Sequence, residues 1–295
     1  AGTTLIPISV LINNWFEDGK RSFSVSIAYM GSGLGGLVLN PFLNSVIQKF
    51  GWSIAFMAIG ILIAIIYIPI VGIFTVSTPE KIGALRIGQK GDVHERERRG
   101  WPFSKAVKVK YFVGSAIALA MVSAAGAAIV FYIVSYYVGI GFSASKAAMV
   151  AGVSVGCVAV GKIIIGWLGD KFSPAAATKV GLFSLAVSFL ALCMVEISDI
   201  LLVPIVVVYG LGVGSITVLS PTIINYFFGD KEFTKMMGLI TMCTGTGVAI
   251  GPLLLGIIID LTASYKIGFV ILSILTCFAG VLLTFLFYKY DKKCH

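Results

Sequence analysis

Apolar segments of about twenty residues, separated by short polar ones, run along almost the whole chain. A run of this length can cross the hydrocarbon core of a bilayer as an α-helix. Because backbone polar groups in lipid must bond within the chain, such runs favour helices over any other form. The sequence predicts eight complete spans and one partial span, at residues 1–12 (partial), 24–47, 52–76, 112–138, 145–168, 176–196, 200–227, 236–259 and 267–288.

Composition agrees with an all-α integral membrane protein. The chain is 58% hydrophobic and 12% charged, whereas soluble domains are about one-quarter charged. Its net charge of +9 could indicate nucleic acid binding or the cytoplasmic bias of basic residues in membrane proteins. The five cysteines and two histidines show no metal-ligand spacing, so we expect neither a metal nor another cofactor.

The positions of the basic residues separate these two explanations. If the segment 77–111 is cytoplasmic and the spans alternate, 18 of the 22 Lys and Arg residues fall on the cytoplasmic side. Only Lys49, Lys146 and Lys266 fall on the outer side. We therefore expect a multi-pass protein of the cell membrane with a cytoplasmic central segment and C-terminus, and no nucleic acid partner.

The same segment divides the chain. We expect a partial N-terminal helical bundle at 1–76, a basic cytoplasmic linker at 77–111, a six-helix bundle at 112–288 and a cytoplasmic tail at 289–295. The first residues, "AGTTLIPISVLI", read as the last half of a span and lack an initiator Met. We expect a chain truncated at its N-terminus, whose parent has twelve helices in two bundles of six.

One charge interrupts the apolar pattern. Lys162, in "VAVGKIIIGWLGDKF", is the only formally charged side chain deep within an expected span. It precedes Asp170 by eight residues, which is about 12 Å along a helix and puts it near the middle of the bilayer. A central Lys costs roughly 2.5–3.5 kcal/mol on insertion scales. A charge kept at this cost is more often functional than structural.

The segment "GWLGDKF", Gly166 to Phe172, resembles the cytoplasmic loop signature of the major facilitator superfamily. The resemblance implies two helical bundles around a central site, and a conformational role for Gly166, Asp170 and Lys171. Gly166 would let two helices approach closely. Asp170 would cap a helix N-terminus and meet a basic partner there.

Four further segments resemble one branch of that superfamily, the oxalate/formate antiporters and monocarboxylate transporters. They are "NNWFEDGKRSFSVSIAYMGSGLGG", "GWSIAF", "SYYVGIGFS" and "GTGVAIGPLLLGIIID". Members of this branch carry a basic residue, most often Arg, four residues before the signature Gly, where it binds the substrate carboxylate. Lys162 occupies the matching position, so the resemblance implies that it binds the substrate.

Two alternatives for Lys162 stay open: a structural ion pair or proton-coupling role, and a lipid-facing side chain that reaches the interface. The chain also departs from the branch. Val158 stands where proton-coupled members often have Asp, and the span 236–259 lacks the second Lys of the antiporter. One central charge favours a monocarboxylate such as formate or lactate over a dicarboxylate.

Four more residues are candidates for the substrate site. Tyr132 and Tyr136 lie one turn apart and share a helix face, with an interfacial aromatic belt as the alternative. Ser32, in "GSGLGG", could line the pocket or serve helix packing. Tyr209, in "VVVYGLGVG", could gate the substrate site or pack in the core.

These features predict a secondary transporter of a small organic anion, coupled to a proton or a counter-anion, and not an enzyme. Its partners would be the anion and the lipid bilayer, and we expect a monomer. A carrier of another solute, such as a sugar or a drug, and a non-transporting sensor on the same fold are the rivals.

Overall fold

The computed structural model describes residues 5–17, 19–88, 100–195 and 201–294. These residues form helices and loops with no strand, and only two isolated bridges, Phe16–Ile87 and Gly100–Gly229. The expectation of an all-α protein is confirmed. The elements are α1 (Leu5–Trp15), α2 (Arg21–Phe50), α3 (Trp52–Leu62), a π-helical segment (Ile63–Tyr67), α4 (Ile68–Phe74), a 3-10 turn (Pro79–Ile82), α5 (Phe103–Ala106), α6 (Lys110–Gly139), α7 (Ala144–Lys171), α8 (Pro174–Leu192), α9 (Leu202–Phe228), α10 (Phe233–Thr262) and α11 (Tyr265–Cys294).

The long helices coincide with the predicted spans. Within the described residues, seven helical stretches are long and apolar enough to cross a membrane. The 30 residues of α2 are long enough to cross as well.

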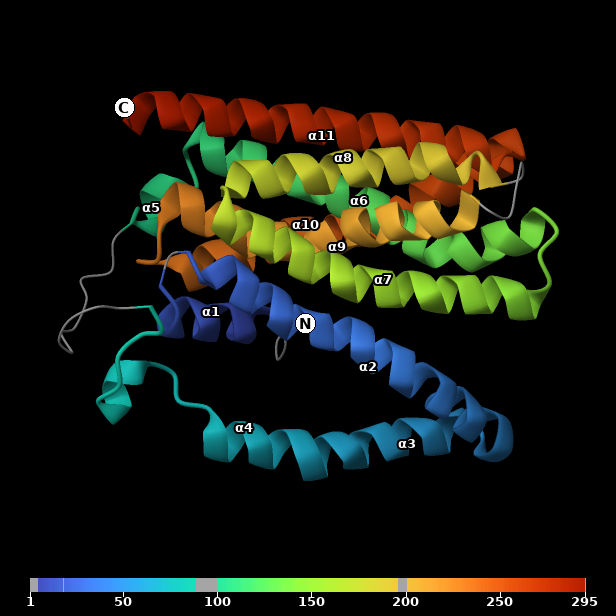
Figure 1. Ribbon diagram of the computed structural model, residues 1–295, viewed down its shortest axis with the longest axis horizontal. Coiled ribbons are helices and arrows are strands. Elements are labelled where there is room, and N and C mark those ends of the chain that lie inside the picture. The colour runs from blue at the N-terminus through green and yellow to red at the C-terminus, as the bar shows by residue number, and fades with distance from the viewer. Residues whose placement is uncertain (1–4, 18, 89–99, 196–200, 295) are drawn as a thin grey trace.

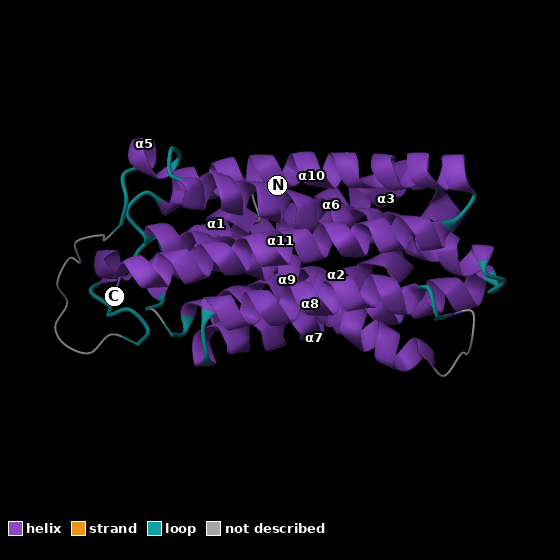
Figure 2. Ribbon diagram, turned by 90° about the horizontal axis from the view of Figure 1, so that it is seen from above, coloured by secondary structure: helices purple, strands orange, loops and turns teal. Residues whose placement is uncertain are grey.

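The helices run back and forth between two ends of the molecule (Figure 1). We call one the Asp170 end, which holds the described loop residues 16–17, 19–20, 75–88, 100–109, 172–173 and 229–232 and the end of α11. The other is the Gly51 end, which holds the turns at 51, 140–143 and 263–264. Figure 2 shows the loops gathered at both ends with the helices between them. Successive long helices therefore run in opposite directions, as the count of basic residues on each side assumed.

Local sequence explains how these helices begin and turn. Ser143 and Ser173 cap α7 and α8, since their side chains accept hydrogen bonds from the backbone amides of Lys146 and Ala176. Gly51 joins α2 to α3 with a φ of 82°, a left-handed value that glycine adopts without strain.

Helices α6 to α11 share one large core. Its buried residues run from Ala106 to Phe287, while a small separate cluster joins Ile12, Val25 and Tyr29 of α1 and α2. Small residues allow close helix contact, as in soluble and membrane bundles alike. A Cβ added at Gly251 of α10 would lie only 2.0 Å from a backbone oxygen of α6.

The span made by α3, the π-helical segment and α4 lies apart from this bundle (Figure 1). Only 6% of its most apolar stretch is buried. The expected linker and tail also differ in detail from the sequence interpretation. The described parts of 77–111 contain the 3-10 turn and α5, and residues 289–294 continue α11 as helix.

Candidate functional site

Lys162 lies on α7 and is buried against α2. Its side chain is 5% exposed. Nζ donates to the backbone oxygen of Tyr29 at 3.0 Å and to Oγ of Ser32 at 2.8 Å. Both acceptors belong to α2, so this lysine joins the N-terminal helices to the six-helix bundle. The lipid-facing alternative is excluded, because the ammonium points into a helix contact.

The two partners of Lys162 are neutral. Among the described residues, the ion pairs involve Arg86 and Lys235, and no carboxylate pairs with Lys162. A buried charge without a counter-charge keeps much of its desolvation penalty. An anion that reached this ammonium would reduce that penalty.

Ser32 and Tyr29 extend the contacts of Lys162 toward α1. Ser32 Oγ also donates to the Tyr29 backbone oxygen at 2.9 Å. The Tyr29 hydroxyl shares a hydrogen bond with Ser9 of α1. Ser32 is exposed, so a small molecule could reach its hydroxyl, which is bonded to Lys162. Sequence analysis missed Tyr29, because it acts through a backbone oxygen that no side-chain pattern indicates.

Glycines hold the backbones close together around Lys162. A Cβ at Gly33 of α2 would lie 2.9 Å from the Ala159 Cβ of α7. A Cβ at Gly161 would lie 2.2 Å from the backbone oxygen of Gly210 on α9. Helix α7 is therefore in tight contact on two sides within one turn of the lysine.

The loop motif connects α7 to the start of α2. Asp170 accepts hydrogen bonds from the backbone amides of Ser22 at 3.0 Å and Phe23 at 2.8 Å. It therefore caps the N-terminus of α2 from another helix, where a negative charge is favoured. Gly166 permits this approach, because a Cβ there would lie 2.3 Å from Ser26 Oγ.

Lys171 turns away from this contact. Its Nζ lies 4.4 Å from the ring centroid of Trp167 and 5.6 Å from that of Phe172. These distances suit cation–π contacts at the surface. Of the three motif residues, Gly166 and Asp170 of α7 both contact α2, whereas Lys171 lies outside this helix contact.

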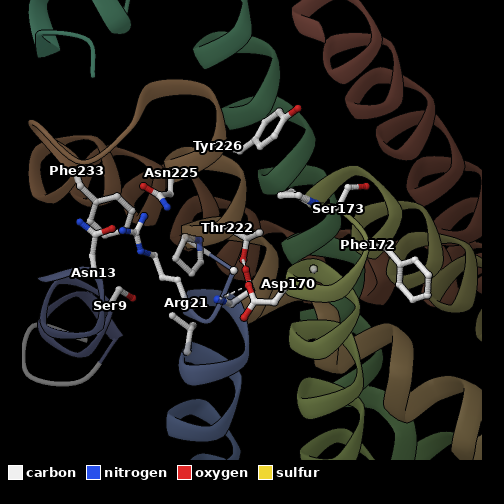
Figure 3. Close-up of a pocket in the computed structure, with 16 residues that line it drawn as sticks. Ser9, Asn13, Arg21, Asp170, Phe172, Ser173, Thr222, Asn225, Tyr226 and Phe233 are labelled. Atoms are coloured by element: carbon white, nitrogen blue, oxygen red, sulfur yellow. Dashed lines mark hydrogen bonds between the residues drawn. The ribbon is translucent and has the colours of Figure 1, made fainter. Parts of the chain in front are cut away.

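A cavity of about 450 Å³ opens beside Asp170, between α1 and α2 on one side and α7 to α10 on the other (Figure 3). Asn13, Arg21, Ser22, Asp170, Thr222 and Asn225 supply most of its polar lining. Sequence analysis did not select Arg21 or Asn13. Their positions at the junction of α1 and α2 match a loop or helix cap equally well.

Tyr132 and Tyr136 pack away from Lys162. Tyr136 is 1% exposed, its hydroxyl donates to the backbone oxygen of Leu192 at 2.5 Å, and its ring meets Tyr265 and Phe269. Tyr132 packs edge-on against Tyr265. These contacts are with α8 and α11, whereas the bonds of Lys162 are with α2. The structure therefore places Tyr136 in the core rather than in a pocket with Lys162.

Tyr209 is 4% exposed and belongs to the large core. Its neighbour Gly210 lies against α7, because a Cβ there would be 2.5 Å from a backbone atom of Cys157. Of the two roles predicted for Tyr209, core packing agrees best with this burial.

The described parts of the linker dock on helix ends. Arg86 lies 3.5 Å from Glu80 and 3.9 Å from Asp230, which belongs to the turn between α9 and α10. Glu232 of the same turn accepts a hydrogen bond from the backbone amide of Phe103. Its other partner is Lys235, at 2.6 Å. Residues 89–99 of the expected basic linker lie outside the described residues.

At this end of the molecule, the pKa of the Glu232 carboxyl is shifted. The hydrogen bond from Lys235 and then that from the Phe103 amide lower its pKa below the ordinary value, while partial burial acts in the opposite direction. The carboxylate form therefore favours the docked linker.

Comparisons with known proteins agree with this arrangement. A family model described as Major Facilitator Superfamily matches residues 1–225 and, a second time, residues 140–293. Monocarboxylate transporter 12 of Homo sapiens is 24% identical over 307 residues, which cover 95% of this chain and 58% of that protein. Monocarboxylate transporter 13 of Rattus norvegicus is 22% identical over 286 residues, with 95% and 63% covered. The chain thus spans about three-fifths of the length of these relatives.

Solved structures show the same fold. The fucose:proton symporter FucP of E. coli superimposes with a TM-score of 0.62 at 15% identity, which covers 96% of this chain and 72% of that one. A second FucP structure, in the outward conformation, gives a TM-score of 0.60 at 18% identity, with 96% and 71% covered.

Proposed function

The chain belongs to the major facilitator superfamily, and from this premise we propose that the whole protein is a secondary transporter of a small monocarboxylate. It is a multi-pass membrane protein of a transporter family. The central segment and the C-terminus would lie in the cytoplasm, where the basic residues of the Asp170 end are favoured.

The observation that carries this proposal is the neutral surroundings of Lys162. An ammonium has three N–H donors. Two of them meet Tyr29 and Ser32 of α2, which leaves the third for a ligand. A carboxylate there would supply the missing counter-charge. One buried cation suits one carboxylate, and two relatives are named monocarboxylate transporters.

Transport would follow from the contact between α2 and α7. The two helices are held together at the Asp170 end and separate toward the Gly51 end (Figure 1). An anion on Lys162 would compete with the α2 acceptors and so favour one arrangement of the helices over another. In this scheme the site opens to each side in turn, and no chemical bond is made or broken.

The test is counterflow of labelled formate, lactate and oxalate by the full-length protein in liposomes, for wild type and Lys162→Gln. We expect exchange of a monocarboxylate by wild type and its loss, by at least about tenfold, in Lys162→Gln. Lys162→Arg, which keeps the charge, should retain part of the activity. Lys266→Gln, at the Gly51 end, is the matched control and should transport normally.

The possible results separate the rival functions. Equal exchange by wild type and Lys162→Gln would make the charge structural and refute the proposed site. Transport of a sugar or drug with no response to anions would assign a different cargo. Tight anion binding without counterflow would indicate a sensor. The pH dependence of uptake would distinguish proton symport from anion exchange.

A further inference from the structure

We propose that the cavity at the Asp170 end is a second anion site, which takes a carboxylate with a hydroxyl on the adjacent carbon. The choice of a carboxylate rests on the proposed function, whereas the need for a ligand hydroxyl is inferred from the residues that line the cavity. The cavity volume of about 450 Å³ falls within the range of small-molecule sites.

Arg21 provides the positive charge. It is the first residue of α2, lines the cavity and is only 7% exposed. Its Nη2 donates to the backbone oxygen of Phe16 at 3.2 Å, which holds the side chain in place. A guanidinium presents five N–H donors in a planar fork, and that fork matches the two oxygens of a carboxylate.

Asn13 is the residue that requires a hydroxyl on the ligand. Its side chain is 4% exposed and lines the cavity, and its Oδ1 is buried without a hydrogen-bond partner among the described residues. Buried polar atoms are nearly always bonded. A carboxylate cannot satisfy Oδ1, because both are acceptors, but a hydroxyl can donate to it.

The two groups converge within the cavity. Figure 3 shows the Asn13 and Arg21 side chains turned toward one another, with Asn225 beside them. A ligand with its carboxylate on Arg21 and its hydroxyl on Asn13 would therefore bridge α1 and α2. The carboxylate in the wall, Asp170, is already bonded to two backbone amides of α2.

This cavity lies between the cluster around Lys162 and the Asp170 end, since Ser9, which bonds to the Tyr29 hydroxyl, also lines it. Asp170, in its wall, follows Lys162 by eight residues on α7, or about 12 Å along the helix. A site at this distance, at the end of the molecule, would hold the anion before it reaches Lys162 or after it leaves.

The experiment is equilibrium binding of lactate and propionate to the purified full-length protein by titration calorimetry. Propionate is the matched ligand, since it lacks only the hydroxyl. We expect Lys162→Gln to retain one site that prefers lactate by about threefold to tenfold, the effect of one hydrogen bond. Asn13→Leu should bind lactate as weakly as propionate, with propionate affinity unchanged.

The unchanged propionate affinity of Asn13→Leu shows that this variant folds, and two further variants test the charge of the site. Asn13→Asp keeps the size and the acceptor but adds a negative charge, so it should lose both acids from this site. Arg21→Gln should do the same by removing the cation. Absence of binding by Lys162→Gln, or an unchanged lactate preference in Asn13→Leu, would overturn the second site. Failure of wild type to transport any monocarboxylate would overturn the proposed function, and it would leave the binding result to stand by itself.

Discussion

At the scale of single residues, two opposite charges on α7 bond to the backbone of α2. Lys162 donates to a carbonyl oxygen of α2, and Asp170 accepts from amides at its first turn. The sequence indicated both residues, because one is an isolated charge in an apolar run and the other belongs to a loop motif. Their partners could not be predicted, since Tyr29, Ser22 and Phe23 take part through backbone atoms.

Asp170→Asn should weaken the cap on α2. The amide keeps the size but loses the charge, and one of its two atoms can no longer accept a hydrogen bond. Bonds to charged groups contribute about 1.5–3 kcal/mol, so we expect amide exchange at Ser22 and Phe23 to accelerate by about tenfold or more.

Hydrogen exchange followed by mass spectrometry measures this change. Asp260→Asn is the control, because Asp260 is an exposed carboxylate near the far end of α10. Unchanged exchange at the start of α2 in Asp170→Asn would show that the cap contributes little.

At the scale of elements, the helices follow from apolar run length, and their contacts follow from glycine. Residues 289–294 extend α11 although most of them are polar, because Tyr290 packs against Tyr111 and Phe227 and Asp291 accepts a hydrogen bond from Tyr226. The 3-10 turn and α5 were not predicted, since four-residue helices have too few positions to show a period. The contact of α7 with α9 at Gly161 and Gly210 also requires the structure, because most glycines of the chain look alike in sequence.

Gly161→Ala and Gly152→Ala form a matched pair on α7. The new Cβ at position 161 would lie 2.2 Å from the Gly210 oxygen, whereas the one at 152 meets nothing within 4 Å. We expect Gly161→Ala to lose about 1–3 kcal/mol of stability through overpacking. Gly152→Ala should be neutral, or gain about 0.5–1 kcal/mol from helix propensity.

Thermal unfolding of both variants in one detergent gives the comparison. Equal midpoints would mean that α7 and α9 can separate at no cost.

At the scale of the whole molecule, the two groups of helices meet along α2 and α7, and the linker fastens the Asp170 end a second time. Its docking on the turn between α9 and α10 depends on Glu232. The pKa of this carboxyl is lowered in the folded protein. Its stabilisation is therefore complete above the ordinary Glu value of about 4.3 and is lost as the pH falls through the lowered pKa.

Glu232→Gln should imitate the acid form at neutral pH. We expect faster tryptic cleavage after Lys105 than in wild type, because the Phe103 amide loses a charged acceptor. Wild type should show the same loosening only in acid, measured as amide exchange at Phe103 relative to the intrinsic rate at each pH, and the Gln variant should not respond to acid. A cleavage rate that is equal in the two proteins at neutral pH would argue against docking by Glu232.

The orientation in the membrane is a further prediction at this scale. Single cysteines at Lys108 and Lys292, in an otherwise cysteine-free protein, should react with an impermeant maleimide only from the cytoplasm. A cysteine at Lys266 should react only from outside. The reverse pattern would invert the proposed topology.

Because Lys162 and Asp170 carry opposite charges, their two contacts on α7 require α2 to run in one direction. The helices are antiparallel, and the N–H end of α2 faces the carboxylate while a carbonyl farther along faces the ammonium. Sliding α2 by one turn, about 5.4 Å, would carry both contacts out of reach together. The two contacts can therefore form together in only one alignment of α2 along α7. Movement of α2 along α7 would then be a discrete step between separate positions.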